Sequence, residues 1–130
     1  MEMYRPTKAI INLEAIRNNL IAFQEKAGDA QVIAVVKADG YGHGAEQVAR
    51  LALESGVRLL AVATPDEALS LRRSGINSDI LVMGAVPPSF LAVAQSENII
   101  VTAISLEWIS KARQAVASAP PLRVHVKVDT

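Results

Sequence analysis

The 130-residue chain contains no cysteine, few aromatic residues and no excess of either charge. Without cysteine it can form neither a disulfide framework nor a thiolate metal site, and this composition suits a reducing compartment such as the cytoplasm. Its 13 basic and 13 acidic residues cancel, so it lacks the positive stripe that nucleic-acid binding needs. No apolar run approaches the ~20 residues of a membrane-spanning helix. We therefore expect no metal site and no nucleic-acid or membrane partner.

What remains is the composition of a soluble domain with a substantial apolar core. Hydrophobic residues make up 51% of the chain, but aromatic residues only 4%. The core must therefore consist mainly of valine, isoleucine, leucine and alanine, which favours α/β packing. A domain of this length buries roughly two-thirds of its unfolded surface, so one core can form without disulfides or metal.

Strand and helix patterns alternate along the chain. Segments between the strands carry apolar residues at three- and four-residue steps, as at Ile16, Leu20 and Phe23, which is typical of amphipathic helices. The alternation predicts parallel strands joined by right-handed crossovers, in either a doubly wound sheet or a (β/α)₈ barrel. A further run, residues 8–13, is predicted to be a strand outside this repeat. The strands of the repeat are predicted at residues 32–37, 59–63, 80–83, 99–102 and 123–128.

Capping residues mark the start and end of one helix. Residues 64–67, Thr-Pro-Asp-Glu, place Thr at the N-cap, Pro at the first helical position and Glu three residues after the cap, which is the pattern of a capping box. The helix that they open is predicted to end at Gly75. Arg72 and Arg73 in its last turn are interpreted as a solvated face.

The most informative segment is residues 34–44, Ala-Val-Val-Lys-Ala-Asp-Gly-Tyr-Gly-His-Gly. Lys37 ends an apolar strand, and ligands of parallel α/β folds bind at the carboxyl ends of strands. An amine in apolar surroundings is suited to imine formation, and the glycines at 40, 42 and 44 would let the backbone approach a phosphate. The alternative is a lysine that reaches into water beside an ordinary glycine-rich turn.

Residues 34–44 closely resemble the segment around the cofactor lysine of bacterial alanine racemases, the fold-type III pyridoxal-phosphate enzymes. The resemblance runs the whole length of the chain, because other segments match the same family in the same order. These segments are Arg5-Pro6-Thr7 and residues 11–20, 64–67 and 125–130.

The resemblance implies roles for three residues. Lys37 would hold pyridoxal 5'-phosphate as an imine and act as one of the two acid–base groups of racemisation. Tyr41 would reach the cofactor phosphate with its hydroxyl. Lys127 would correspond to a lysine that is often carbamylated and then orients a catalytic arginine. From the residues alone, Lys127 can equally be an ordinary lysine paired with Asp129.

The resemblance also implies a fold and a reaction. The fold would be the N-terminal part of a (β/α)₈ TIM-type barrel, with about five parallel strands and their helices. Residues 1–130 would form a partial barrel domain, without the C-terminal barrel strands and the C-terminal β-domain. The reaction would interconvert L-alanine and D-alanine in a cytoplasmic homodimer, supplying D-alanine for peptidoglycan.

Two alternatives stay open at this point. One is an inactive or non-enzymatic half-barrel, which needs nothing that the chain lacks. The other is a different fold-type III pyridoxal-phosphate protein, such as a decarboxylase, which would also carry a cofactor lysine on its first barrel strand. The resemblance places the second catalytic base and the catalytic arginine outside residues 1–130, so we expect this chain alone to be inactive.

Overall fold

The computed structural model describes residues 4–130, in which helices and strands alternate. No helix within these residues is long and apolar enough to cross a membrane. In chain order the elements are α1 (Leu13–Ala27), β1 (Ile33–Val35), α2 (Lys37–Tyr41), α3 (Ala45–Glu54), β2 (Leu59–Val62), α4 (Pro65–Arg73), β3 (Asp79–Val82), the 3-10 turn η1 (Pro88–Phe90), α5 (Leu91–Ser96), β4 (Ile99–Ala103), α6 (Leu106–Ala115) and β5 (Val124–Val126).

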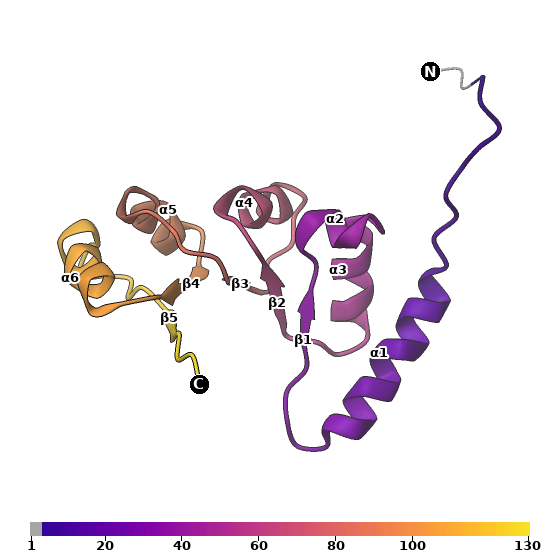
Figure 1. Ribbon diagram of the computed structural model, residues 1–130, viewed down its shortest axis with the longest axis horizontal. Coiled ribbons are helices and arrows are strands. Elements are labelled where there is room, and N and C mark those ends of the chain that lie inside the picture. The colour runs from indigo at the N-terminus through magenta and orange to yellow at the C-terminus, as the bar shows by residue number, and fades with distance from the viewer. Residues whose placement is uncertain (1–3) are drawn as a thin grey trace.

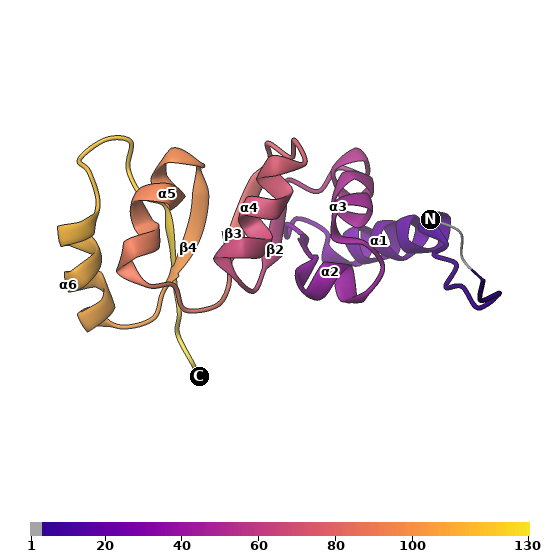
Figure 2. The same ribbon diagram turned by 90° about the horizontal axis from the view of Figure 1, so that it is seen from above.

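The strands form one parallel sheet in the order β1-β2-β3-β4-β5. Figure 1 shows them side by side along an arc, with α3, α4, α5 and α6 on its outer side, and Figure 2 shows the same row from above. Every strand of the predicted repeat is therefore present, with bounds that differ from the predicted ones by at most two residues at either end. Because all five strands run in one direction, their carboxyl ends lie at one edge of the sheet.

The two faces of the sheet are covered differently. Side chains on the outer face, such as Leu60, Ile80 and Val101, are fully buried in the core that the helices share. On the inner face, Ala61, Leu81 and Ile100 pack mainly against one another in a separate, smaller cluster. A doubly wound sheet carries helices on both faces, whereas a barrel carries them only outside. The packing therefore selects the barrel from the two folds that the strand spacing allowed.

The predicted capping residues occupy the positions expected of them. The Thr64 hydroxyl accepts a hydrogen bond from the Glu67 N–H, and the Glu67 carboxylate accepts one from the Thr64 N–H, which completes the capping box. Gly75, with φ 84°, follows the end of α4. Another helix, α6, is capped by Ser105, whose hydroxyl accepts the Trp108 N–H.

The strand predicted at residues 8–13 is wrong. Residues 8–12 belong to no helix or strand, and Leu13 already begins α1. Asn12 is the N-cap of α1, and its side chain accepts the Ala15 N–H at 3.0 Å. A strand needs a hydrogen-bonded neighbour, and within residues 4–130 no strand pairs with this segment. The helix cap therefore decides where the regular structure begins.

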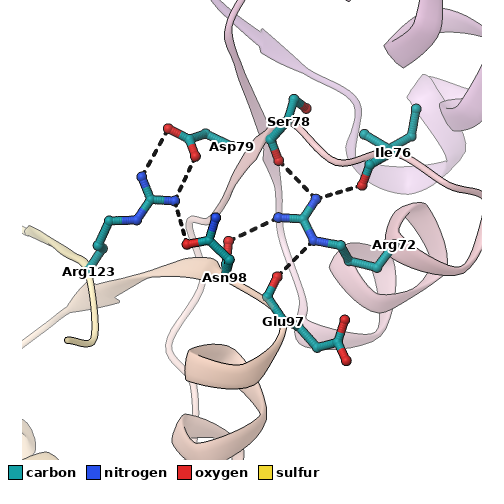
Figure 3. Close-up of polar contacts among 7 residues, drawn as sticks. All are labelled: Arg72, Ile76, Ser78, Asp79, Glu97, Asn98 and Arg123. Carbon is teal, nitrogen blue, oxygen red and sulfur yellow. Dashed lines mark hydrogen bonds and ion pairs between the residues drawn. The ribbon is translucent and has the colours of Figure 1, made fainter. Parts of the chain in front are cut away.

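The solvated face predicted at Arg72 is also wrong, although Arg73 is exposed. The Arg72 guanidinium donates hydrogen bonds to four carbonyl oxygens: those of Ile76, Ser78, Glu97 and Asn98, at 2.8 to 2.9 Å (Figure 3). These carbonyls lie just before β3 and β4. Arg72 therefore joins α4 to the amino ends of two strands, and burial lowers the pKa of its guanidinium.

A second arginine holds the last strand at the same end of the sheet. The Arg123 guanidinium binds both carboxylate oxygens of Asp79, at 3.0 and 2.6 Å, and the side-chain oxygen of Asn98 (Figure 3). The hydrogen bond from Arg123 holds the pKa of the Asp79 carboxyl below its usual value. The pair thus connects β5 to β3 across β4.

Candidate functional site

The candidate site begins where β1 ends. Val36 is buried on the helix side, and its N–H continues the sheet by donating to the Ala61 carbonyl at 2.9 Å. Lys37 follows directly and is half-buried at the carboxyl end of the strand. Its ammonium lies 6.0 Å from the centre of the Tyr41 ring, within the range of a cation–π contact. The structure therefore brings Lys37 and Tyr41 together.

The segment that follows Lys37 winds in the left-handed sense. Ala38, Asp39 and Tyr41 have φ angles of 50°, 53° and 56°, and Gly40 and Gly42 between and after them are also positive. Left-handed backbone costs roughly 1–2 kcal/mol for each residue with a Cβ. Runs of such residues persist only where surrounding contacts hold them, and they are concentrated at functional sites.

Backbone hydrogen bonds close this turn on itself. The Gly40 N–H donates to the Val36 carbonyl, the Gly42 N–H to the Ala38 carbonyl and the Gly44 N–H to the Asp39 carbonyl. The glycine N–H groups are thus already used within the loop. That the glycines let the backbone approach a phosphate stays a prediction, and in the structure they also serve the left-handed path of the loop.

Glu67 ties the turn to the neighbouring strand. One carboxylate oxygen accepts the Ala38 N–H at 2.7 Å, and the other accepts the N–H groups of Ala63 at 2.7 Å and Thr64 at 3.1 Å. Burial acts to raise the pKa of this carboxyl, but these backbone hydrogen bonds outweigh it and the pKa is lowered. The carboxylate is therefore ionised at neutral pH and bridges the ends of β1 and β2.

Lys127 lies at the same edge of the sheet but beyond the opposite outer strand. Its N–H extends the β5 ladder by donating to the Ala103 carbonyl at 3.0 Å. Its ammonium pairs with the Asp129 carboxylate at 3.3 Å, and 51% of the Lys127 side chain is exposed. Lys37 and Lys127 are therefore both at carboxyl ends of strands, with three strands between their own.

Some residues of the site have structural roles that the sequence analysis missed. The capping box identified Glu67 as a helix cap, but its bond to Ala38 joins residues 29 positions apart and leaves no local signal. Asp39 caps α3 by accepting the Ala45 N–H at 2.9 Å. The spacing of Asp39 and Ala45 is too long for an ordinary N-cap, because the left-handed turn lies between them.

Comparison with known proteins now adds to this geometry. A family model described as the N-terminal domain of alanine racemase matches residues 11–130. An alanine racemase from Anoxybacillus flavithermus is 48% identical over 133 residues, which cover 98% of this chain and 34% of the relative. The chain belongs to the alanine racemase family.

Solved structures of alanine racemases agree with this assignment. The alanine racemase from Bacillus anthracis, solved with bound L-Ala-P, matches with a TM-score of 0.87 at 39% identity. The match covers 96% of this chain and 33% of the Bacillus anthracis chain. A histidine racemase from Leuconostoc mesenteroides matches with a TM-score of 0.81 at 30% identity, and the match covers 88% of this chain and 31% of the histidine racemase chain. The open sheet is thus the N-terminal part of the racemase barrel. The chain spans about a third of the length of the curated alanine racemases that it matches.

Proposed function

We propose that the protein carrying this chain is an alanine racemase, which interconverts L-alanine and D-alanine with pyridoxal 5'-phosphate held by Lys37. The carrying observation is the placement of Lys37 beside Tyr41 at the carboxyl end of the first strand, in a chain of the alanine racemase family. Ligands of barrel enzymes bind at this edge of the strands. The family membership argues against a non-enzymatic half-barrel or a decarboxylase.

The chemistry of the two side chains fits this cofactor. Lys37 carries a primary amine, the group that bonds covalently to an aldehyde such as that of pyridoxal phosphate. Tyr41 is 59% exposed and can donate its hydroxyl to a phosphate oxygen. The N–H groups of Gly40, Gly42 and Gly44 donate within the loop, so the proposal relies on the Tyr41 hydroxyl for the phosphate contact from this segment.

Each group has a distinct task in this proposal. The bound cofactor supplies an electron sink that acidifies the Cα–H of the substrate amine. The Lys37 amine would remove or return the proton on one face of Cα. Racemisation needs a second acid–base group on the other face, and we assign it to the partner subunit of a homodimer. Inversion at Cα is possible because the two acid–base groups lie on opposite faces of that carbon.

Lys127 has a separate proposed role. We propose that carbon dioxide adds to its neutral amine, with loss of a proton, to form a carbamate that orients an arginine of the active site. The exposed Lys127 amine is accessible to carbon dioxide, and its ion pair with Asp129 is the competing state. Carbon NMR of the intact protein in isotope-labelled bicarbonate distinguishes the two: absence of a carbamate signal that is lost in Lys127→Ala contradicts the carbamate.

The remaining proposals concern the complete protein. We propose that residues 1–130 are part of a barrel domain whose other strands, and a further β-domain, are supplied by additional residues. The outer edges of β1 and β5 carry no neighbouring strand within the described residues, which is where such strands would add. Activity in the cytoplasm stays a prediction from the cysteine-free composition.

The test is an alanine racemisation assay on the complete protein that carries this chain. Lys37→Ala is compared with Lys26→Ala, which replaces an exposed lysine in the last turn of α1. We expect Lys37→Ala to abolish racemisation and Lys26→Ala to leave it unchanged. Equal activity of the two variants would contradict the proposed role of Lys37.

The same assay addresses a second substrate. The likeness to a histidine racemase at 30% identity makes histidine a specific alternative. The higher identities to alanine racemases, 48% and 43% for two of them, favour alanine. A higher kcat/KM for L-histidine than for L-alanine would replace the proposed substrate.

A further inference from the structure

The bridge made by Glu67 exceeds what helix capping requires. A capping box needs the carboxylate at the third helical position to accept only the N–H of the N-cap residue, here Thr64. Glu67 also accepts the N–H groups of Ala63 and Ala38, each at 2.7 Å, which is shorter than its 3.1 Å bond to Thr64. The two shorter bonds lie outside the capping motif and connect the ends of two strands.

These bonds fix the backbone on both sides of Lys37. Before it, the Val36 N–H is held by the Ala61 carbonyl in the sheet. After it, the Ala38 N–H is held by Glu67. Ala38 has a φ of 50° but only a methyl side chain, so it cannot stabilise this conformation with a side-chain hydrogen bond of its own. An external acceptor is therefore needed to hold the backbone at this position.

We propose that Glu67 is a positioning residue for Lys37: by binding the Ala38 N–H it holds the left-handed turn and sets the direction of the Lys37 amine. This role rests on the proposed function, in which the Lys37 amine must reach both the cofactor and the substrate Cα. In this proposal Glu67 acts on Lys37 through the Ala38 N–H and not by contact with the cofactor or the substrate. A displacement of about 1 Å in a catalytic group can reduce a rate by about 100-fold, so a firm anchor has a kinetic consequence.

The test compares Glu67→Gln with Thr64→Ala in the complete protein that carries this chain. Glutamine keeps the size of the side chain, but it has only one acceptor oxygen and turns an amide NH₂ toward one of the two sets of N–H groups. Thr64→Ala removes the hydroxyl half of the capping box and leaves the Glu67 contacts with Ala38, Ala63 and the Thr64 backbone intact. Measured for each are kcat, KM for alanine, the melting temperature and the rate at which Lys37 is labelled by pyridoxal phosphate and borohydride.

We expect Glu67→Gln to lower kcat and the labelling rate by about 10- to 100-fold with little change in KM. Thr64→Ala is expected to lower the melting temperature and keep both rates. Wild-type rates in Glu67→Gln, or equal rate losses in both variants, would overturn the positioning role. A wild-type protein without label on Lys37 would overturn the proposed function and this role with it.

A second pair of variants covers the case in which Glu67→Gln does not fold. Ala38→Gly removes the Cβ penalty at φ 50° and keeps the N–H that Glu67 binds. The double variant Ala38→Gly/Glu67→Gln is then compared with Ala38→Gly alone. The positioning role predicts that the double variant is labelled on Lys37 about 10- to 100-fold more slowly than Ala38→Gly alone. Equal labelling rates would contradict it.

Discussion

Several residues next to Lys37 adopt an unfavourable backbone conformation, and the turn that they form positions the Lys37 side chain. Ala38, Asp39 and Tyr41 each have a positive φ, at a cost of roughly 1–2 kcal/mol per residue. The Asp39 carboxylate offsets part of this cost by capping α3 through the Ala45 N–H. The result is a turn that reverses the chain directly after the strand and leaves Lys37 and Tyr41 on the same loop.

Gly40 shows how little room this turn has. A Cβ at Gly40 would lie 3.3 Å from the Ala45 backbone nitrogen, and φ is already 61°. Gly75 also has a positive φ, 84°, but a Cβ there would meet nothing within 4 Å. The two glycines thus share the backbone penalty and differ in the space around them.

We therefore predict that Gly40→Ala destabilises the fold more than Gly75→Ala. The left-handed backbone penalty of roughly 1–2 kcal/mol applies to both, and crowding adds roughly another 1 kcal/mol at Gly40. Urea unfolding of the complete protein that carries this chain measures both. Gly40→Ala should also slow the labelling of Lys37, and equal effects of the two substitutions on stability and labelling would contradict this account.

At the scale of elements, two arginines secure the amino ends of the strands, opposite the candidate site. Arg72 links α4 to the segments before β3 and β4, and Arg123 links β5 to β3. Contacts at this end of the sheet serve stability, since ligands of barrel enzymes bind at the other end. The two arginines thus join the strands at the edge of the sheet that lies opposite the candidate site.

The neighbouring residues Arg72 and Arg73 provide a matched test of whether the link from α4 to the segments before β3 and β4 stabilises the fold. Arg72→Ala leaves the carbonyls of Ile76, Ser78, Glu97 and Asn98 without their donor, and we expect a loss of about 2–4 kcal/mol in unfolding free energy. Arg73→Ala replaces an exposed side chain and should change stability by less than about 0.5 kcal/mol. Similar losses in the two variants, measured by urea unfolding, would show that the carbonyl contacts contribute little.

The Asp79–Arg123 pair predicts a pH dependence. The pKa of Asp79 is lower in the folded protein than in the unfolded chain, mainly because of the hydrogen bond from Arg123. The pair therefore stabilises the fold above the unfolded pKa of about 3.9, and this contribution is lost as the pH falls through the lowered folded value. Asp79→Asn should remove the contribution at neutral pH, so the melting temperature of the variant should fall less steeply than that of the wild type as the pH decreases. Parallel acid limbs for wild type and variant, in thermal unfolding from about pH 5 to about pH 2, would contradict the assignment.

At the scale of the whole molecule, the described sheet is open at both edges. Val126 on β5 is 68% exposed and Ile33 on β1 is 39% exposed, although both are apolar strand residues. The described ladders end at these two strands. Unpaired strand edges with apolar neighbours are prone to pair with other chains. The 130 residues by themselves thus resemble a section of a barrel more than an independent domain.

We predict that these 130 residues, expressed alone, associate or aggregate instead of remaining monomeric. Edge-to-edge pairing of β1 or β5 would cover the apolar surface that the sheet leaves open, most simply in a two-fold dimer. Light scattering over a series of protein concentrations measures the mass. A compact monomer that unfolds cooperatively at high concentration would show that the edges are protected by the chain itself.

The parts of this architecture that were predictable are those with local signals. The parallel repeat follows from alternating apolar patterns, and the Thr64–Glu67 capping box from four adjacent residues. The strand predicted at residues 8–13 is wrong because a short apolar run does not show whether a partner strand exists. The four-carbonyl role of Arg72 and the bond from Ala38 to Glu67 depend on tertiary contacts, and nothing in the flanking residues predicts them.

All the chemistry proposed for this site depends on Lys37 being the residue that binds pyridoxal phosphate. The complete protein that carries this chain is treated with pyridoxal phosphate and borohydride and digested, and the modified peptide is mapped. The account predicts label on Lys37, lost in Lys37→Ala. Label mainly on exposed lysines such as Lys8, Lys26 or Lys111 would contradict it, because a surface amine would then explain the reaction.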